Sequence, residues 1–224
     1  MAQDAPQARV GERNGASPGR APFVRHHRRY DEWFERHRVA YLSELLAVRA
    51  LLPWAGRGLE IGVGTGRFAG PLGVAFGIDP APQMLTYARS RGVECACAAA
   101  EALPFGDAAF DYALIVTTLC FLDDAQAALR EARRVLRPGG ALVVGIIDRE
   151  SPLGRGYAEH KAGNVFYRGA HFYSVSDVET LLEKAGFRER CWLQTLFTAP
   201  LSQREIEPAA EGTGRGAFVV VRAQ

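Results

Sequence analysis

Short apolar runs alternate with amphipathic helical segments throughout residues 58–224, and few architectures accommodate that order. The runs are GLEIG, GVAFGID, VECAC, FDYALIV and GALVVGIID, followed by two more at 188–198 and 216–222. Helical periodicity is found between them, over 82–91, 123–136 and 176–185. Buried runs separated by helices predict an α/β fold, with a mostly parallel sheet covered by helices on both faces. The last two runs have no helix between them, so we expect them to pair antiparallel.

The amino-terminal part of the chain has a different composition. Residues 1–21 are polar and rich in Gly, Pro and Arg, which predicts a disordered tail and neither a signal peptide nor a membrane anchor. In residues 22–52 apolar side chains recur at spacings of three and four, which predicts a cap of one or two amphipathic helices. We expect residues 22–224 to form a single domain. Within it, residues 149–173 have weak periodicity and are predicted to be an insertion on the substrate side of the sheet.

Composition and charge exclude several classes of protein. The chain of 224 residues has a formal net charge of +2 and contains no apolar stretch of the roughly 18–20 residues needed to span a bilayer. Its basic cluster at 25–29 is followed at once by acidic residues, which disfavours nucleic-acid binding. The four cysteines lack the spacing of a zinc site, so we expect free thiols and no metal. We therefore predict a cytoplasmic protein with neither nucleic acid nor membrane as partner; its oligomeric state is not indicated by the sequence.

A glycine-rich loop follows the first apolar run. The segment 58–68 has the pattern strand, tight turn and helix start, with glycines at Gly62, Gly64 and Gly66. Such glycines permit positive φ and let a ligand approach the main chain closely. A nicotinamide or flavin fingerprint would place its third glycine at position 67, which is Arg67, and a phosphate-binding P-loop would require a lysine that is absent here. The loop therefore predicts a nucleotide-like ligand that is neither a dinucleotide nor ATP.

Two acidic residues accompany the loop. Asp79 ends the second apolar run, so its carboxylate is expected at the tip of the neighbouring strand, where it can accept hydrogen bonds from ribose hydroxyls. Glu60 lies inside the first run and adds a second negative charge. Two carboxylates suit a cationic ligand and would repel a diphosphate. Together, the loop and the acids predict a positively charged adenosyl ligand.

Four motifs now occur in a specific order along the chain. They are EIGVGTGRF, GIDPAPQML, AEALPFGDAAFD and ALREARRVLRPGG. This series resembles the successive motifs of class I S-adenosylmethionine-dependent methyltransferases, and most of all the methyltransferase type 11 family. The resemblance extends from about Tyr30 to the carboxyl terminus. It implies a Rossmann-like, doubly wound sheet of seven strands with the last strand antiparallel, an N-terminal helical lid, and S-adenosyl-L-methionine as cofactor, with S-adenosyl-L-homocysteine as product.

The resemblance also implies which residues bind the cofactor. They are Tyr30, Trp33, Glu60, Gly62, Gly64, Gly66, Asp79, Pro80, Met84, Ala100, Glu101 and Thr117. The glycines would line the methionine part, Glu60 and the Thr117 carbonyl would lie near its amino group, and Asp79 would hold the ribose. Pro80 and Met84 would flank the adenine, and residues 100 and 101 would offer main-chain groups to its edge. Tyr30 and Trp33 would belong to the lid, with Tyr30 reaching the methionine carboxylate.

Two features depart from the family pattern. Position 99, often an aspartate that contacts the adenine amino group, is Ala99, so that contact is absent or replaced. The helix after the glycine loop is short and contains Pro71, which leaves the role of Arg67 open.

The acceptor side is less well defined by sequence. Cys120, Asp148, Tyr157 and His160 are candidate substrate contacts, although Cys120 could equally be a small buried hydrophobe and Asp148 a helix or turn cap. No catalytic base is assigned. We predict a methyltransferase that acts on a small soluble acceptor, for which an amine is one candidate. The alternatives are a cofactor-binding module without turnover and a nicotinamide-dependent oxidoreductase.

Overall fold

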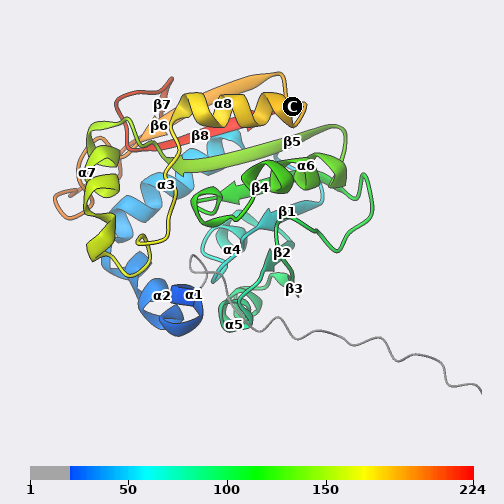
Figure 1. The fold of residues 1–224 in the computed structure, drawn as a ribbon, viewed down its shortest axis with the longest axis horizontal. Helices are drawn as coiled ribbons and strands as arrows, with labels where there is room; N and C mark the ends of the chain where they lie inside the picture. The colour runs from blue at the N-terminus through cyan, green and yellow to red at the C-terminus, as the bar shows by residue number, and fades with distance from the viewer. Residues whose placement is uncertain (1–20) are drawn as a thin grey trace, which may run out of the picture.

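The computed structural model describes residues 21–224 and contains an eight-stranded sheet (Figure 1). Residues 1–20, nearly all of the expected tail, lie outside the described residues. The strands are β1 (Gly58–Ile61), β2 (Phe76–Asp79), β3 (Glu94–Cys97), β4 (Phe110–Val116), β5 (Leu136–Ile147), β6 (Arg190–Thr195), β7 (Ala210–Glu211) and β8 (Phe218–Ala223). Their spatial order is β3-β2-β1-β4-β5-β8-β6-β7.

The strand pairing confirms the predicted doubly wound topology. Strands β1 to β5 pair in parallel, whereas β8 pairs antiparallel with both β5 and β6. The last strand is therefore antiparallel, as expected. The predicted number of strands, seven, was wrong by one. Strand β7 pairs with the outer edge of β6 and has only two residues, too few to produce an alternating apolar pattern in the sequence.

Ten helical segments accompany the sheet in the described part of the chain. They are α1 (Ala21–Arg25), α2 (His27–Arg36), α3 (Arg38–Leu51), α4 (Ala69–Leu72), α5 (Pro82–Ser90), α6 (Ala125–Val135), α7 (Pro152–His160) and α8 (Val175–Lys184), with 3₁₀ turns η1 (Leu119–Phe121) and η2 (Lys161–Gly163). The predicted cap consists of three helices rather than one or two, because the chain leaves helical geometry at His26 and His37. None of these helices is long and apolar enough to cross a membrane.

The segment 149–173 is more ordered than its weak periodicity suggested. It contains α7, which begins at Pro152 after the Ser151 side chain accepts a hydrogen bond from the Gly154 amide. Two glycines within α7 interrupt its apolar stripe, which explains why the helix was missed.

Alternating side chains of the central strands face two separate apolar layers. Leu142 and Val144 of β5 belong to the layer beneath α6 and α8, whereas Val143 belongs to the layer beneath α3 and α5. In Figure 1 the short helices α1 and α2 lie beside α5, next to the carboxyl ends of β1 and β2. The lid is therefore held close to the end of the sheet at which the glycine loop emerges.

Candidate functional site

One cavity, the loop cavity, lies at the carboxyl ends of β1, β2 and β4, where the strand order reverses direction. Ligands of doubly wound folds bind at this position. Nine of the twelve predicted cofactor-binding residues line it: Tyr30, Gly62, Gly64, Asp79, Pro80, Met84, Ala100, Glu101 and Thr117. The structure thus brings together residues from the lid, the glycine loop and three strand ends around one cavity.

Gly62 and Gly64 shape the floor of the loop cavity. The Gly62 and Val63 amides both donate to the Ile78 carbonyl at 2.8 Å, which joins the loop to the neighbouring strand. Gly62 and Gly64 have φ of +76° and +52°, the left-handed region that favours glycine. A Cβ at Gly64 would lie 3.5 Å from Met84 Cε and 3.8 Å from the Tyr30 ring, inside the cavity. The bare main chain therefore forms a cradle that any side chain would fill.

Gly66 has a packing role instead. A Cβ at this position would lie 2.9 Å from Ala88 Cα in α5. Gly66 therefore permits the close approach of α5 to the loop, and it does not line the loop cavity.

The two predicted carboxylates occupy different positions. Asp79 lies in the cavity wall, where Oδ2 accepts from the Gly64 amide at 3.1 Å and Oδ1 accepts from the Ala81 amide at 2.8 Å. Glu60 lies behind the loop rather than in the wall: it is buried, and its Oε2 accepts from the Ala69 amide at 2.7 Å. Burial raises the pKa of Glu60 to about 8, and the nearby charge of Asp79 acts in the same direction.

The electrostatic character of the loop cavity follows from these acids. Among the described residues that line the loop cavity, none is Lys, Arg or His, but two are acidic, Asp79 and Glu101. A diphosphate would find no cationic partner there, and a positively charged ligand would be favoured. The site therefore fits a sulfonium nucleoside better than a dinucleotide.

The end of β4 is fastened to the glycine loop. The Thr118 hydroxyl lies within hydrogen-bond distance of the carbonyls of Gly62 (3.1 Å) and Val116 (3.0 Å). Thr117 before it has φ of +48°, an unfavourable conformation for a β-branched residue. Strained residues of this kind concentrate at ligand sites, and Thr117 lines the loop cavity.

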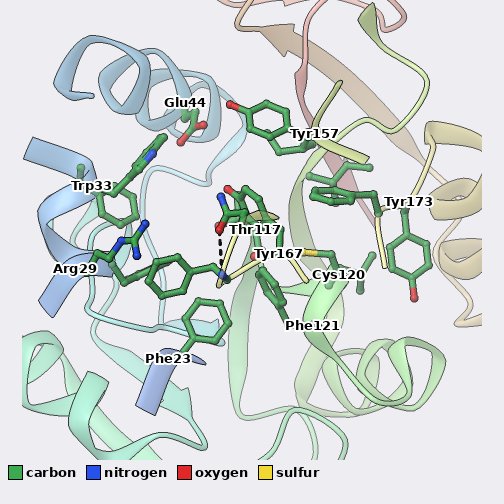
Figure 2. Close-up of a pocket in the computed structure, with 18 of the residues that line it drawn as sticks. Phe23, Arg29, Trp33, Glu44, Thr117, Cys120, Phe121, Tyr157, Tyr167 and Tyr173 are labelled. Atoms are coloured by element: carbon green, nitrogen blue, oxygen red, sulfur yellow. Dashed lines mark hydrogen bonds between the residues drawn. The ribbon is translucent and has the colours of Figure 1, made fainter. Parts of the chain in front are cut away.

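A second cavity of about 230 Å³, the aromatic cavity, adjoins the first (Figure 2). Four residues line both cavities: Phe23, Tyr30, Thr117 and Phe121. More than half of the described residues that line the aromatic cavity are Phe, Tyr or Trp. Trp33, predicted to belong to the cofactor lid, lines this cavity and not the loop cavity.

The four predicted substrate contacts separate into two pairs. Cys120 and Tyr157 line the aromatic cavity. Asp148 does not: it is buried in a turn, where its Oδ1 accepts from the Glu150 amide at 3.0 Å, the capping role that was the alternative for it. His160 is exposed on an outer groove, with its Nδ1 2.9 Å from the Gly156 carbonyl oxygen. Asp148 and His160 thus lie outside both inner cavities of the described chain.

Arg67, whose role the sequence left open, connects the glycine loop to the lid. Its guanidinium binds the Asp31 carboxylate at 2.7 Å and the Glu35 carboxylate at 2.5 Å, both in α2. Arg91 also binds Asp31, at 3.0 Å. Burial opposes ionisation of Asp31, but the hydrogen bonds from Arg67 and Arg91 hold its pKa below the ordinary value. These ion pairs hold α2 over both cavities.

Sequence reasoning missed Phe23, Glu44, Thr118 and Phe121 as site residues. For Glu44 a signal was available, because it falls within the buried helical stripe formed by Ala40, Ala47 and Val48 of α3. An acidic residue in such a stripe is uncommon and indicates a functional position. The other three carry no comparable signal, since apolar residues and threonines at these positions are equally typical of a core.

Comparison with known proteins gives the family. A family model described as a methyltransferase domain matches residues 59–144. The crystal structure of a Thermotoga maritima protein, titled a SAM-dependent methyltransferase and possible histamine N-methyltransferase, is 53% identical, with 91% of this chain and 98% of that chain covered and a TM-score of 0.89. This chain belongs to the S-adenosylmethionine-dependent methyltransferases. The family assignment confirms the predicted resemblance and leaves the nicotinamide-dependent alternative without support.

Other relatives of this methyltransferase differ in how much of the chain they share. An uncharacterised protein of Methanocaldococcus jannaschii is 41% identical over 202 residues, 90% of this chain and 98% of its own. The malonyl-[acyl-carrier protein] O-methyltransferase of Methylococcus capsulatus is 38% identical over 113 residues, 45% of this chain and 40% of its own. The second alignment covers less than half of either chain, so it gives no guide to the acceptor of this methyltransferase.

Proposed function

We propose that this methyltransferase transfers the methyl group of S-adenosylmethionine to a small acceptor, such as an amine, held in the aromatic cavity. The observation that carries the proposal is the wall shared by the two cavities, formed by Phe23, Tyr30, Thr117 and Phe121. A donor in the loop cavity and an acceptor in the aromatic cavity would meet at this wall. Methyl transfer requires such a meeting, with the two reacting atoms about 3 Å apart.

The residues of the loop cavity fit the donor. When bound, S-adenosylmethionine supplies an electrophilic methyl group on a positively charged sulfur. The Gly62 and Gly64 main chain would hold the methionine part, and Asp79 would accept hydrogen bonds from the ribose. Pro80 and Met84 would flank the adenine, while the main chain at 100 and 101 would face its edge. Glu60, behind the loop, would act on the ligand only indirectly, through the first amide of α4, from which it accepts a hydrogen bond.

The residues of the aromatic cavity would position the acceptor and exclude water. Their rings pack against one another across three parts of the chain: the centroid of Phe23 lies 4.8 Å from that of Phe121 and 5.5 Å from that of Phe166. Burial, together with nearby carboxylates, raises the pKa of Tyr30 far above its ordinary value, so its hydroxyl remains a neutral donor. Burial likewise raises the pKa of Cys120 to about 12, so this thiol is protonated and is not a base at neutral pH.

Two measurements test the proposal. Calorimetry is expected to show binding of S-adenosylhomocysteine and no binding of NADH. Incubation with methyl-labelled S-adenosylmethionine and a panel of amines, thiols and carboxylates is then expected to transfer label to a small acceptor. Binding of the product without transfer to any member of the panel would favour a binding module, and absence of S-adenosylhomocysteine binding would contradict the proposal.

A further inference from the structure

Glu44 is a buried carboxylate with no partner of its own. It lies in α3, its residue exposure is 4%, and it lines the aromatic cavity. Its side chain makes no hydrogen bond or ion pair with any residue between 21 and 224. Burial alone raises its pKa to about 8. A buried carboxylate without a partner costs free energy, so its presence here calls for a ligand that satisfies it.

The neighbouring residue shows that this absence is specific to Glu44. Ser43 is also buried, but its hydroxyl accepts from the Gln203 side chain and from the Glu207 amide, both at 2.9 Å. Ser43 therefore docks the carboxyl-terminal part of the chain onto α3. Glu44 contributes nothing of this kind and points into the cavity, between Trp33 and Tyr157 (Figure 2).

The surroundings of Glu44 favour a cation. The rings of Tyr30, Trp33, Tyr157 and Tyr167 line the same cavity, and aromatic faces attract ammonium groups. Figure 2 shows the hydroxyl end of Tyr157 turned toward Glu44. A positive group at this position would meet one buried carboxylate and several rings, and burial strengthens such attractions.

The cationic residues of the cavity lie elsewhere. In the described lining these are Arg29 and Arg36, both on exposed positions of α2. Arg29 lies over the Phe166 ring, 6.0 Å from its centroid, and Arg36 donates to the Glu32 carbonyl at 3.4 Å. The acidic side chain is thus inside the cavity and the basic side chains are at its solvent side. An acceptor would enter with its cationic end first, and an anionic end would be disfavoured next to Glu44.

We propose that Glu44 selects the acceptor: the carboxylate binds the ammonium group of a small organic amine whose hydrophobic part packs against the aromatic rings. The inference rests on the proposed function, because it takes the aromatic cavity to be the acceptor site. Glu44 is accordingly a specificity-determining residue. Amines bind, their neutral alcohol counterparts bind weakly, and carboxylates of the same size are rejected.

Calorimetry in the presence of saturating S-adenosylhomocysteine tests this selection. The probes are histamine, phenethylamine and tryptamine, with 2-phenylethanol and phenylacetate as the neutral and anionic counterparts of phenethylamine. At least one amine is expected to bind at least tenfold more tightly than 2-phenylethanol, with no measurable binding of phenylacetate. Glu44→Gln should remove this tenfold preference, while Glu159→Gln, which changes an exposed acid of α7 outside the cavity, should keep it.

The outcomes separate the two proposals. Unchanged S-adenosylhomocysteine affinity and a melting temperature no lower than that of the unaltered protein would show that Glu44→Gln is folded, so that loss of amine preference is a loss of recognition. An amine preference that survives Glu44→Gln, tighter binding of phenylacetate, or no binding by any amine would overturn the inference and leave the proposed function standing. Failure of the unaltered protein to bind S-adenosylhomocysteine would overturn the proposed function itself.

Discussion

The two adjoining cavities are built in different ways. The loop cavity takes most of its wall from the turn at 62–66, the end of β2 and the end of β4, and at Gly62 and Gly64 it exposes bare main chain. The aromatic cavity takes its wall almost entirely from side chains on α1, α2, α3, η1 and the segment 149–173. The first is therefore sensitive to changes in backbone shape, and the second to changes in individual side chains. This difference suits an enzyme family that keeps its donor and varies its acceptor.

The largest expected effect comes from filling the cradle. Gly64→Leu would place a side chain between Met84 and Tyr30, and we expect the affinity for S-adenosylhomocysteine to fall at least a hundredfold. Gly73→Leu is the matched control: Gly73 also has positive φ, at +72°, but a Cβ there meets nothing within 4 Å. Both variants carry a similar backbone strain of about 1 kcal/mol. Equal loss of affinity in both, measured by calorimetry, would contradict the assignment of the loop cavity to the donor.

Asp79→Ala tests the one side chain on which the loop cavity depends most. Loss of a charged acceptor should weaken S-adenosylhomocysteine binding by about 1–3 kcal/mol, the usual contribution of hydrogen bonds to a charged group. Asp107→Ala removes an exposed carboxylate paired with Arg134 and serves as the control, with no expected change. An affinity that is the same in both variants would count against Asp79 as a ribose ligand.

Arg67→Ala tests whether the lid connects the two cavities. The variant loses the ion pairs with Asp31 and Glu35, so α2 should detach and both cavities should bind their ligands a few times more weakly. Faster hydrogen exchange in α2 would report the detachment directly. Arg28→Ala breaks only an exposed pair with Glu32 and should leave exchange unchanged. If Arg67→Ala weakened the binding of the donor but not of the acceptor, or the reverse, the lid would not connect the two cavities.

The same ion pairs predict a response of the lid to acid. The folded-state pKa of Asp31 is lowered, so its contribution to stability is present above the unfolded pKa of about 4 and is lost as the pH falls through the folded value. Exchange in α2 should therefore increase below about pH 4 in the natural protein. In Asp31→Asn it should already be faster at pH 7 and should respond less to acid.

The smallest expected effect concerns the stability of the aromatic cavity. The pKa of Glu44 is raised to about 8 by burial, so the folded protein holds a proton there that the unfolded chain releases above about pH 4.5. Glu44 therefore lowers the free energy of unfolding, by an amount that grows as the pH rises from 4.5 to 8. Glu44→Gln should recover this free energy of unfolding and raise the melting temperature at pH 8.5 by about 2–4 °C for each kcal/mol recovered. The increase should be smaller at pH 5. A larger gain at pH 5 would show that the carboxylate is not destabilised by burial.

Most of the lining of the loop cavity could be predicted from sequence because its parts are local. The positions of Gly62 and Gly64 relative to the first strand, and of Asp79 at the end of the next, follow from the alternation of apolar runs and turns. The placement of Glu60 and Gly66 could not be predicted in the same way. Whether a residue next to a loop faces the ligand or the layer behind it depends on how α4 and α5 pack, and the structure places both residues behind the loop.

The lining of the aromatic cavity was only partly predictable, for a related reason. Cys120 and Tyr157 reach the aromatic cavity, whereas Asp148 and His160 belong to the same stretches of sequence and do not. A strand end or an insertion is indicated by composition, but the direction of each side chain within it is set by helix caps and turns such as the one at Asp148. These contacts form only when the segment has folded against the rest of the chain.

By itself, the sequence determined the α/β topology, the glycine turn and the family, because these depend on periodicity and on conformations that only glycine adopts easily. Tertiary structure alone decided that Phe23, Glu44 and Tyr167, distant along the chain, line one cavity. The chemistry of Glu44 depends on that assembly: a carboxylate on an exposed helix is an ordinary charged group, and only packing removes it from water and leaves it in need of a cation.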